Sequence, residues 1–88
     1  MPLLVDVRES WEFEYCRIDG AVSIPLGQLG RRLAEIPRDR PLVMICHHGS
    51  RSGHAALLLA QAGYGEVYNL SGGVAAWAID VEPGMKTY

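Results

Sequence analysis

The chain turns from strand to helix across one short stretch, Leu42-Val43-Met44-Ile45-Cys46-His47-His48-Gly49-Ser50-Arg51-Ser52. The first four residues are apolar and partly β-branched, which is typical of a buried strand. An alanine- and leucine-rich segment follows, and it predicts a helix over residues 51–62 that Ser50 caps and Gly63 ends. A cysteine therefore lies between the carboxyl end of a strand and the start of a helix.

This arrangement is a suitable environment for a nucleophile. Successive backbone N–H groups at such a turn can point inward and, together with the helix dipole, attract an anion. The same groups stabilise a thiolate, so we expect Cys46 to ionise more readily than a free cysteine and to act as the catalytic residue.

Charge is distributed unevenly around the loop. Residues 41–65 contain no Asp or Glu, although the whole chain has a net charge of -2. A locally electropositive loop favours a small anionic substrate. We therefore expect the loop residues to bind that substrate, namely His47, His48, Gly49, Ser50 and Arg51. No metal or organic cofactor is expected, because adjacent histidines on a tight loop do not converge easily on one ion.

The rest of the chain alternates between strands and helices. Apolar runs predict strands at 3–7, 21–24, 42–46 and 66–70, and apolar spacing predicts helices at 11–15, 26–36, 51–62 and after Gly72-Gly73. This order predicts an α/β fold with a small, twisted, mostly parallel sheet of four or five strands and helices on both faces. Ligands bind such sheets beyond the carboxyl ends of the strands, where Cys46 is placed.

Burial can also be predicted from these patterns. The 51–62 helix is apolar on nearly all sides, so it should be central, with Leu58 and Leu59 nearly buried. We expect Trp11 and Trp77 to be core residues or hydrophobic staples of their helices, and Cys46 to be only partly exposed. Asp6 and Arg8 should form structural polar contacts at the end of the first strand.

Length and composition limit the alternatives. Eighty-eight residues with 49% apolar content make one small globular domain, covering residues 1–88 with a tail at 80–88. The charge balance does not support nucleic-acid binding, and no apolar run reaches the ~20 residues needed to span a bilayer. The start of the sequence does not resemble a signal peptide, and two cysteines without one suggest a cytoplasmic location.

Four motifs, in order, resemble the rhodanese-like domain family of single-domain sulfurtransferases. They are Leu3-Leu4-Val5-Asp6-Val7-Arg8, Gly20-Ala21-Val22-Ser23-Ile24-Pro25-Leu26, the Cys46–Ser52 loop, and Gly63-Tyr64 through Asn69-Leu70-Ser71-Gly72-Gly73-Val74-Ala75-Ala76-Trp77. The resemblance covers residues 3–77. It differs at Cys16-Arg17-Ile18, where the family usually has Gly-His-Ile, and in lacking the family's usual strand and helix ahead of Leu3.

The resemblance implies transfer of sulfane sulfur through a cysteine persulfide. The donor would be a small anion such as thiosulfate, and the acceptor would be cyanide, a thiol or a sulfur-acceptor protein. We expect a monomer or weak homodimer. An alternative is a sulfur-relay module for a partner protein, and a third is a cysteine-dependent phosphatase or arsenate reductase. Phosphatases that resemble this fold have five residues between cysteine and arginine, whereas four lie between Cys46 and Arg51.

Overall fold

A four-stranded parallel sheet forms the centre of the molecule. The computed structural model describes residues 2–85, apart from the side chain of Ile79. The strands are β1 (Leu3–Asp6), β2 (Val22–Ser23), β3 (Leu42–Ile45) and β4 (Val67–Asn69), in the order β2-β1-β3-β4. Every pairing is parallel. The predicted α/β class is therefore confirmed, with four strands in the described part of the chain.

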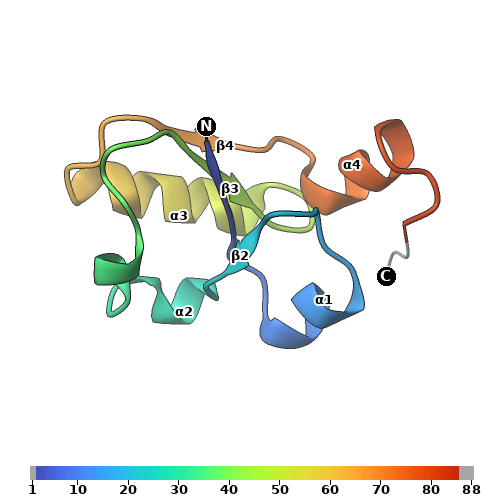
Figure 1. Ribbon diagram of the computed structural model, residues 1–88, viewed down its shortest axis with the longest axis horizontal. Helices are drawn as coiled ribbons and strands as arrows, with labels where there is room; N and C mark the ends of the chain where they lie inside the picture. Colours follow the sequence, from blue (N-terminus) through green and yellow to red (C-terminus); the bar gives the residue numbers. More distant parts are fainter. Residues whose placement is uncertain (1, 86–88) are drawn as a thin grey trace.

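Helices cover both faces of this sheet (Figure 1). They are α1 (Ser10–Tyr15), α2 (Leu26–Leu29), α3 (Ser50–Gln61) and α4 (Gly73–Asp80), together with a 3-10 turn, η1 (Leu33–Glu35). The α2 and α3 helices lie on one side of the strands, and α1 and α4 lie on the other (Figure 1).

The core is divided by the sheet into two clusters. The larger one lies on the α2–α3 side and includes Val5, Met44 and Leu59, all fully buried. The smaller one lies on the α1–α4 side and includes Ile45 and Val74. Neighbouring residues of β3 thus contribute to opposite clusters, as the two-residue period of a strand requires.

The register of the sheet brings the carboxyl ends of β1 and β3 to the same edge. Asp6 at the end of β1 pairs with Ile45 at the end of β3, and Val7 continues the pairing through an N–H donated to the Ile45 carbonyl at 2.9 Å. The residues that follow both strands therefore leave the sheet at the same edge.

Several helix predictions need correction. The segment 26–36 forms α2 and η1 rather than one helix, because Gly27 and Gly30 both lower its helix propensity. The α3 helix begins one residue early, since Gly49 rather than Ser50 is the capping residue.

The predicted burial of α3 is correct on one face only. Leu59 is fully buried, but Leu58 is 37% exposed. Within residues 2–85, no second layer covers the outer face of α3, so its apolar composition on all sides does not indicate a central position. Trp11 is also wrongly predicted as core, because it is 60% exposed on the outer face of α1.

Candidate active site

Cys46 lies directly after β3, at the carboxyl edge of the sheet. It is 1% exposed, which is less than the partial exposure expected from the sequence. The loop that follows folds back over the side chain. The start of α4 packs on its backbone, where the Cys46 carbonyl accepts an N–H from Val74 at 2.8 Å. Cys46 is thus held from both sides.

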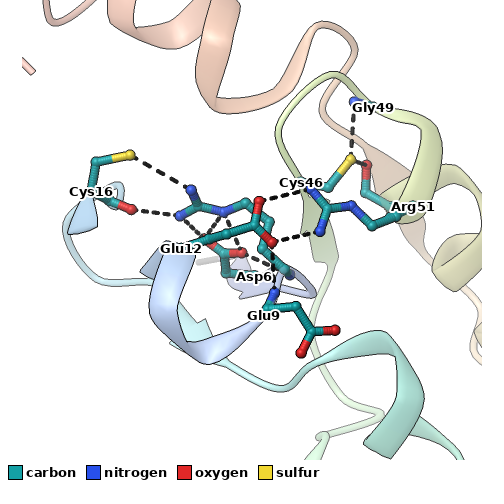
Figure 2. Close-up of polar contacts among 9 residues, drawn as sticks. Asp6, Glu9, Glu12, Cys16, Cys46, Gly49 and Arg51 are labelled. Carbon is teal, nitrogen blue, oxygen red and sulfur yellow. Dashed lines mark hydrogen bonds and ion pairs between the residues drawn. The ribbon is translucent and has the colours of Figure 1, made fainter. Parts of the chain in front are cut away.

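Hydrogen-bond donors gather around the Cys46 sulfur (Figure 2). The backbone N–H of Gly49 donates to Sγ at 3.0 Å, and the Ser52 Oγ lies 3.3 Å from it. Gly49 has a φ of 102°, in the left-handed region that glycine adopts without steric cost. That conformation turns its N–H toward the sulfur.

These donors change the acidity of the thiol. Burial raises the pKa of Cys46. The Ser52 hydroxyl lowers this pKa, and so do the backbone N–H groups of Ser52, Gly49 and Arg51. The lowering effects prevail, so the pKa of Cys46 lies below that of an ordinary cysteine. The loop is therefore built to hold a thiolate.

Asn69, at the end of β4, fixes two of the donor residues. Its Nδ2 donates to the Gly49 carbonyl at 3.0 Å, and its Oδ1 accepts from the Ser52 hydroxyl. Cys46, Gly49, Asn69 and Ser52 thus form a closed ring of polar contacts around the sulfur. The sequence analysis did not select Asn69. The signal was its position at the carboxyl edge of the last strand, as the only asparagine in the chain.

Gly73 allows α4 to approach the site. Its φ is 59°, and a Cβ there would lie 2.1 Å from the Cys46 carbonyl oxygen and 2.5 Å from that of His47. Only glycine fits at this distance. The Ala75 N–H then donates to the His47 carbonyl at 3.0 Å, so the first turn of α4 supports the start of the nucleophile loop.

Arg51 forms a two-point ion pair with Glu12 of α1 (Figure 2). Its Nη1 and Nη2 lie 2.6 and 3.0 Å from the two carboxylate oxygens. The side chain of Glu12 is 5% exposed and that of Arg51 37%. The sequence analysis missed Glu12, because the loop segment itself contains no acid and this carboxylate comes from a distant part of the chain.

A second ion pair, between Arg8 and Asp6, connects β1 to the end of α1. Arg8 and Asp6 are fully buried, and Arg8 Nη2 lies 2.7 Å from Asp6 Oδ2. The same nitrogen donates to the Cys16 carbonyl at 2.6 Å, at the end of α1. The expected structural role of Asp6 and Arg8 is confirmed, and it connects the end of β1 to α1.

The two loop histidines differ in exposure. His48 is exposed and His47 is half-buried, with their rings 4.2 Å apart between centroids. Burial lowers the pKa of His47, and the charge of His48 lowers it further. His47 is therefore predominantly neutral at pH 7. Among the described residues, no three potential metal-ligating side chains form a cluster.

The predicted loop residues thus lie in different environments. Cys46 is buried, Gly49 contacts its sulfur, and Arg51 extends toward α1. His48 and Ser50 are exposed at the outer side of the loop. Within residues 2–85, no helix has the length and apolar character needed to cross a membrane.

Known proteins with similar sequences include sulfurtransferases. The family model described as the rhodanese-like domain matches residues 1–80. A sulfurtransferase from Allochromatium vinosum is 45% identical over 76 residues, covering 86% of this chain and 71% of the relative. The thiosulfate sulfurtransferase GlpE from Shewanella oneidensis is 39% identical over 74 residues, covering 84% of this chain and 73% of that protein.

Solved structures show the same fold. A rhodanese-related protein from Thermoplasma volcanium superposes with a TM-score of 0.86 and 30% sequence identity. The match covers 93% of this chain and 81% of that one.

Proposed function

This chain belongs to the rhodanese-like domain family, and on that premise we propose that it transfers sulfane sulfur from an anionic donor such as thiosulfate through a persulfide on Cys46. A rhodanese-type role in sulfur transfer agrees with the similar sulfurtransferases. The observation that carries the proposal is the polar environment of the Cys46 sulfur, which accepts the Gly49 N–H and lies 3.3 Å from the Ser52 hydroxyl.

The reaction has two balanced steps. The Cys46 thiolate attacks the outer sulfur of thiosulfate, a new S–S bond forms, and sulfite leaves with the electron pair of the bond that breaks. The product is a persulfide anion on Cys46. Cyanide or a thiolate then attacks the outer sulfur of this persulfide, which yields thiocyanate or a new persulfide and restores the Cys46 thiolate.

The loop serves both charged states. We propose that the N–H groups that stabilise the thiolate also stabilise the negative charge of the persulfide. We propose that the donor anion binds to the loop residues identified in the sequence, which are His47, His48, Gly49, Ser50 and Arg51. Because His47 is predominantly neutral and Arg51 is paired with Glu12, the N–H groups contribute most of the attraction for the anion.

The test is a mass measurement after incubation with thiosulfate. We expect the protein to gain one sulfur atom at Cys46, and Cys46→Ser to abolish both this gain and thiocyanate formation with cyanide. Cys16→Ser is the matched control and should retain both. Cys16 is buried in the smaller core cluster, and its Sγ lies 3.6 Å from Arg8 Nη1. Sulfur found on Cys16 instead would refute the proposal.

A second assay separates sulfur transfer from phosphoryl transfer. The four-residue spacing draws the loop tightly around one sulfur, which leaves little room for a tetrahedral phosphoryl group. We expect aryl phosphates to be very poor substrates. Phosphatase activity that is robust and lost in Cys46→Ser would contradict this assignment.

The identity of the acceptor distinguishes an independent enzyme from a relay module. Both functions share the Cys46 persulfide. If the persulfidated protein passes its sulfur to a protein thiol much faster than to cyanide or small thiols, the relay function is favoured.

A further inference from the structure

We propose that Glu12 is a positioning residue for the nucleophile loop, acting through its ion pair with Arg51. The inference deepens the proposed function, because it names a residue outside the loop on which the reactivity of Cys46 depends. Glu12 lies on α1, far from the loop in the sequence, and Figure 2 shows its carboxylate directed at Arg51.

The Glu12 carboxylate is buried, and its burial costs free energy. Glu12 is 3% exposed as a residue, and a buried charge is expensive unless it is paired and hydrogen-bonded. Its Oε1 accepts the Glu9 backbone N–H at 2.9 Å in addition to Arg51 Nη1. Its Oε2 accepts Arg51 Nη2. The carboxylate is thus fixed by its own helix and oriented toward the loop.

Arg51 belongs to the part of the loop that surrounds the Cys46 sulfur. It occupies the first turn of α3, and its backbone N–H is one of the groups that stabilise the Cys46 thiolate. Its neighbours Ser50 and Ser52 lie on either side, and Ser52 contacts the sulfur directly. A two-point ion pair restricts the rotation of a planar guanidinium more than a single contact does. Holding the side chain of Arg51 therefore restrains the N–H groups around Sγ.

The α1 helix, which carries Glu12, is itself held in place by Arg8. Arg8 donates to the Cys16 carbonyl at the end of this helix and is itself paired with Asp6, the last residue of β1. The β1 strand pairs with β3, which ends just before Cys46. The contacts therefore connect the nucleophile to the loop through α1 as well as along the chain.

Charge and positioning predict opposite effects of removing the carboxylate. A nearby negative charge disfavours a thiolate, so if Glu12 acted by charge alone, Glu12→Gln would lower the pKa of Cys46. If Glu12 acts by positioning, the loop loses its restraint, the N–H groups stabilise the thiolate less, and the pKa rises. A purely structural role would change the free energy of unfolding but not this pKa in the folded protein.

The experiment measures the rate of alkylation of Cys46 by iodoacetamide as a function of pH, with the modified peptide identified by mass spectrometry. We expect Glu12→Gln to raise the pKa of the thiol by about half a unit or more, which slows alkylation about threefold below the pKa. The other titratable or charged groups around the site are His47, His48 and Arg8, and they are the same in each variant. A pKa that is unchanged or lower overturns the inference.

A second variant keeps the test decisive if Glu12→Gln does not fold. Arg51→Lys retains the positive charge at a position that is 37% exposed but loses the two-point contact. Positioning predicts that it raises the pKa of Cys46 as well, whereas an unchanged pKa overturns the inference. The double variant should resemble each single variant, because all three break the same ion pair.

The matched control is Glu14→Gln. Glu14 is exposed on the same helix, so its replacement makes the same chemical change away from the loop. We expect its alkylation profile to match that of the unmodified protein. Alkylation does not require sulfur transfer, so a protein that fails to use thiosulfate would refute the proposed function while leaving the role of Glu12 to be decided by the pKa.

Discussion

At the scale of single residues, the two cysteines illustrate how surroundings determine reactivity. Both are buried and neither forms a disulfide. Cys46 accepts a backbone N–H on its sulfur and has a hydroxyl beside it, whereas Cys16 packs among apolar side chains with Arg8 nearby. Burial alone would make both thiols inert, so the N–H groups of the loop make the difference.

The low pKa of Cys46 links stability to pH. The thiol ionises more readily in the folded protein than in the unfolded chain, where its pKa is about 8.5. The resulting stabilisation is fully present above that value and is lost as the pH falls through the folded-state pKa. We expect the free energy of unfolding of the unmodified protein to rise with pH over this interval relative to that of Cys46→Ser.

Urea unfolding of both proteins at a series of pH values, under reducing conditions, measures this difference. Ser52→Ala serves as an intermediate case, because it removes one of the groups that stabilise the thiolate. A difference between the two proteins that is constant across the interval would contradict the lowered pKa.

At the scale of secondary-structure elements, the site depends on where helices begin. The α3 helix begins at the loop because Gly49 takes a left-handed conformation, and α4 begins against the carbonyls of Cys46 and His47 because Gly73 has no side chain. Both glycines thus allow the backbone to come close to Cys46.

Gly73→Ala tests this dependence. The added Cβ meets backbone oxygen atoms that cannot move independently, and φ is in the left-handed region, so we expect a loss of about 2 kcal/mol or more in the free energy of unfolding. Thiocyanate formation should fall as well, since α4 supports the start of the loop. Urea unfolding and the cyanide assay provide the two measurements.

Gly27→Ala is the matched control for this variant. No heavy atom lies within 4 Å of its Cβ position, and its φ is not in the left-handed region. We expect it to be neutral or slightly stabilising, since alanine favours helix more than glycine does. Equal effects of the two substitutions would show that the close approach of α4 is not important.

At the scale of the whole molecule, the two clusters are connected through the sheet. Leu59 belongs to the cluster on the α2–α3 side, and Cys16 belongs to the cluster on the α1–α4 side. The β3 strand contributes neighbouring residues to both. A small domain of this kind is expected to unfold as one cooperative unit.

Leu59→Ala should therefore expose Cys16 on the opposite face. We expect the substitution to cost about 2–5 kcal/mol, since Leu59 is fully buried. The urea midpoint for alkylation of Cys16 should fall together with the midpoint from circular dichroism. Leu58→Ala is the neighbouring control. Because Leu58 is 37% exposed, we expect a cost of about 1 kcal/mol or less. A Cys16 midpoint that does not follow Leu59→Ala would show that the two faces unfold separately.

The class of the fold and the position of the candidate nucleophile can be predicted from the amino-acid sequence alone. Hydrophobic period and the order of elements predict the parallel sheet, because these signals are local and repeat along the chain. The loop from Cys46 to Ser52 could also be identified, since the cysteine, the glycine and the helix start are consecutive. Gly49 lies in the turn after Cys46, and its N–H donates to the sulfur from there.

The distant residues that complete the site, and the apolar faces that become covered, depend on how the elements pack in three dimensions. Glu12, Asn69 and Gly73 reach the loop from three other elements, and their contacts with it form only when these elements pack together. The exposure of Leu58 and Trp11 has the same origin. An apolar side chain is buried only where another layer packs on it, and in a chain of 88 residues the layers cover one face of α3 and leave the other in water.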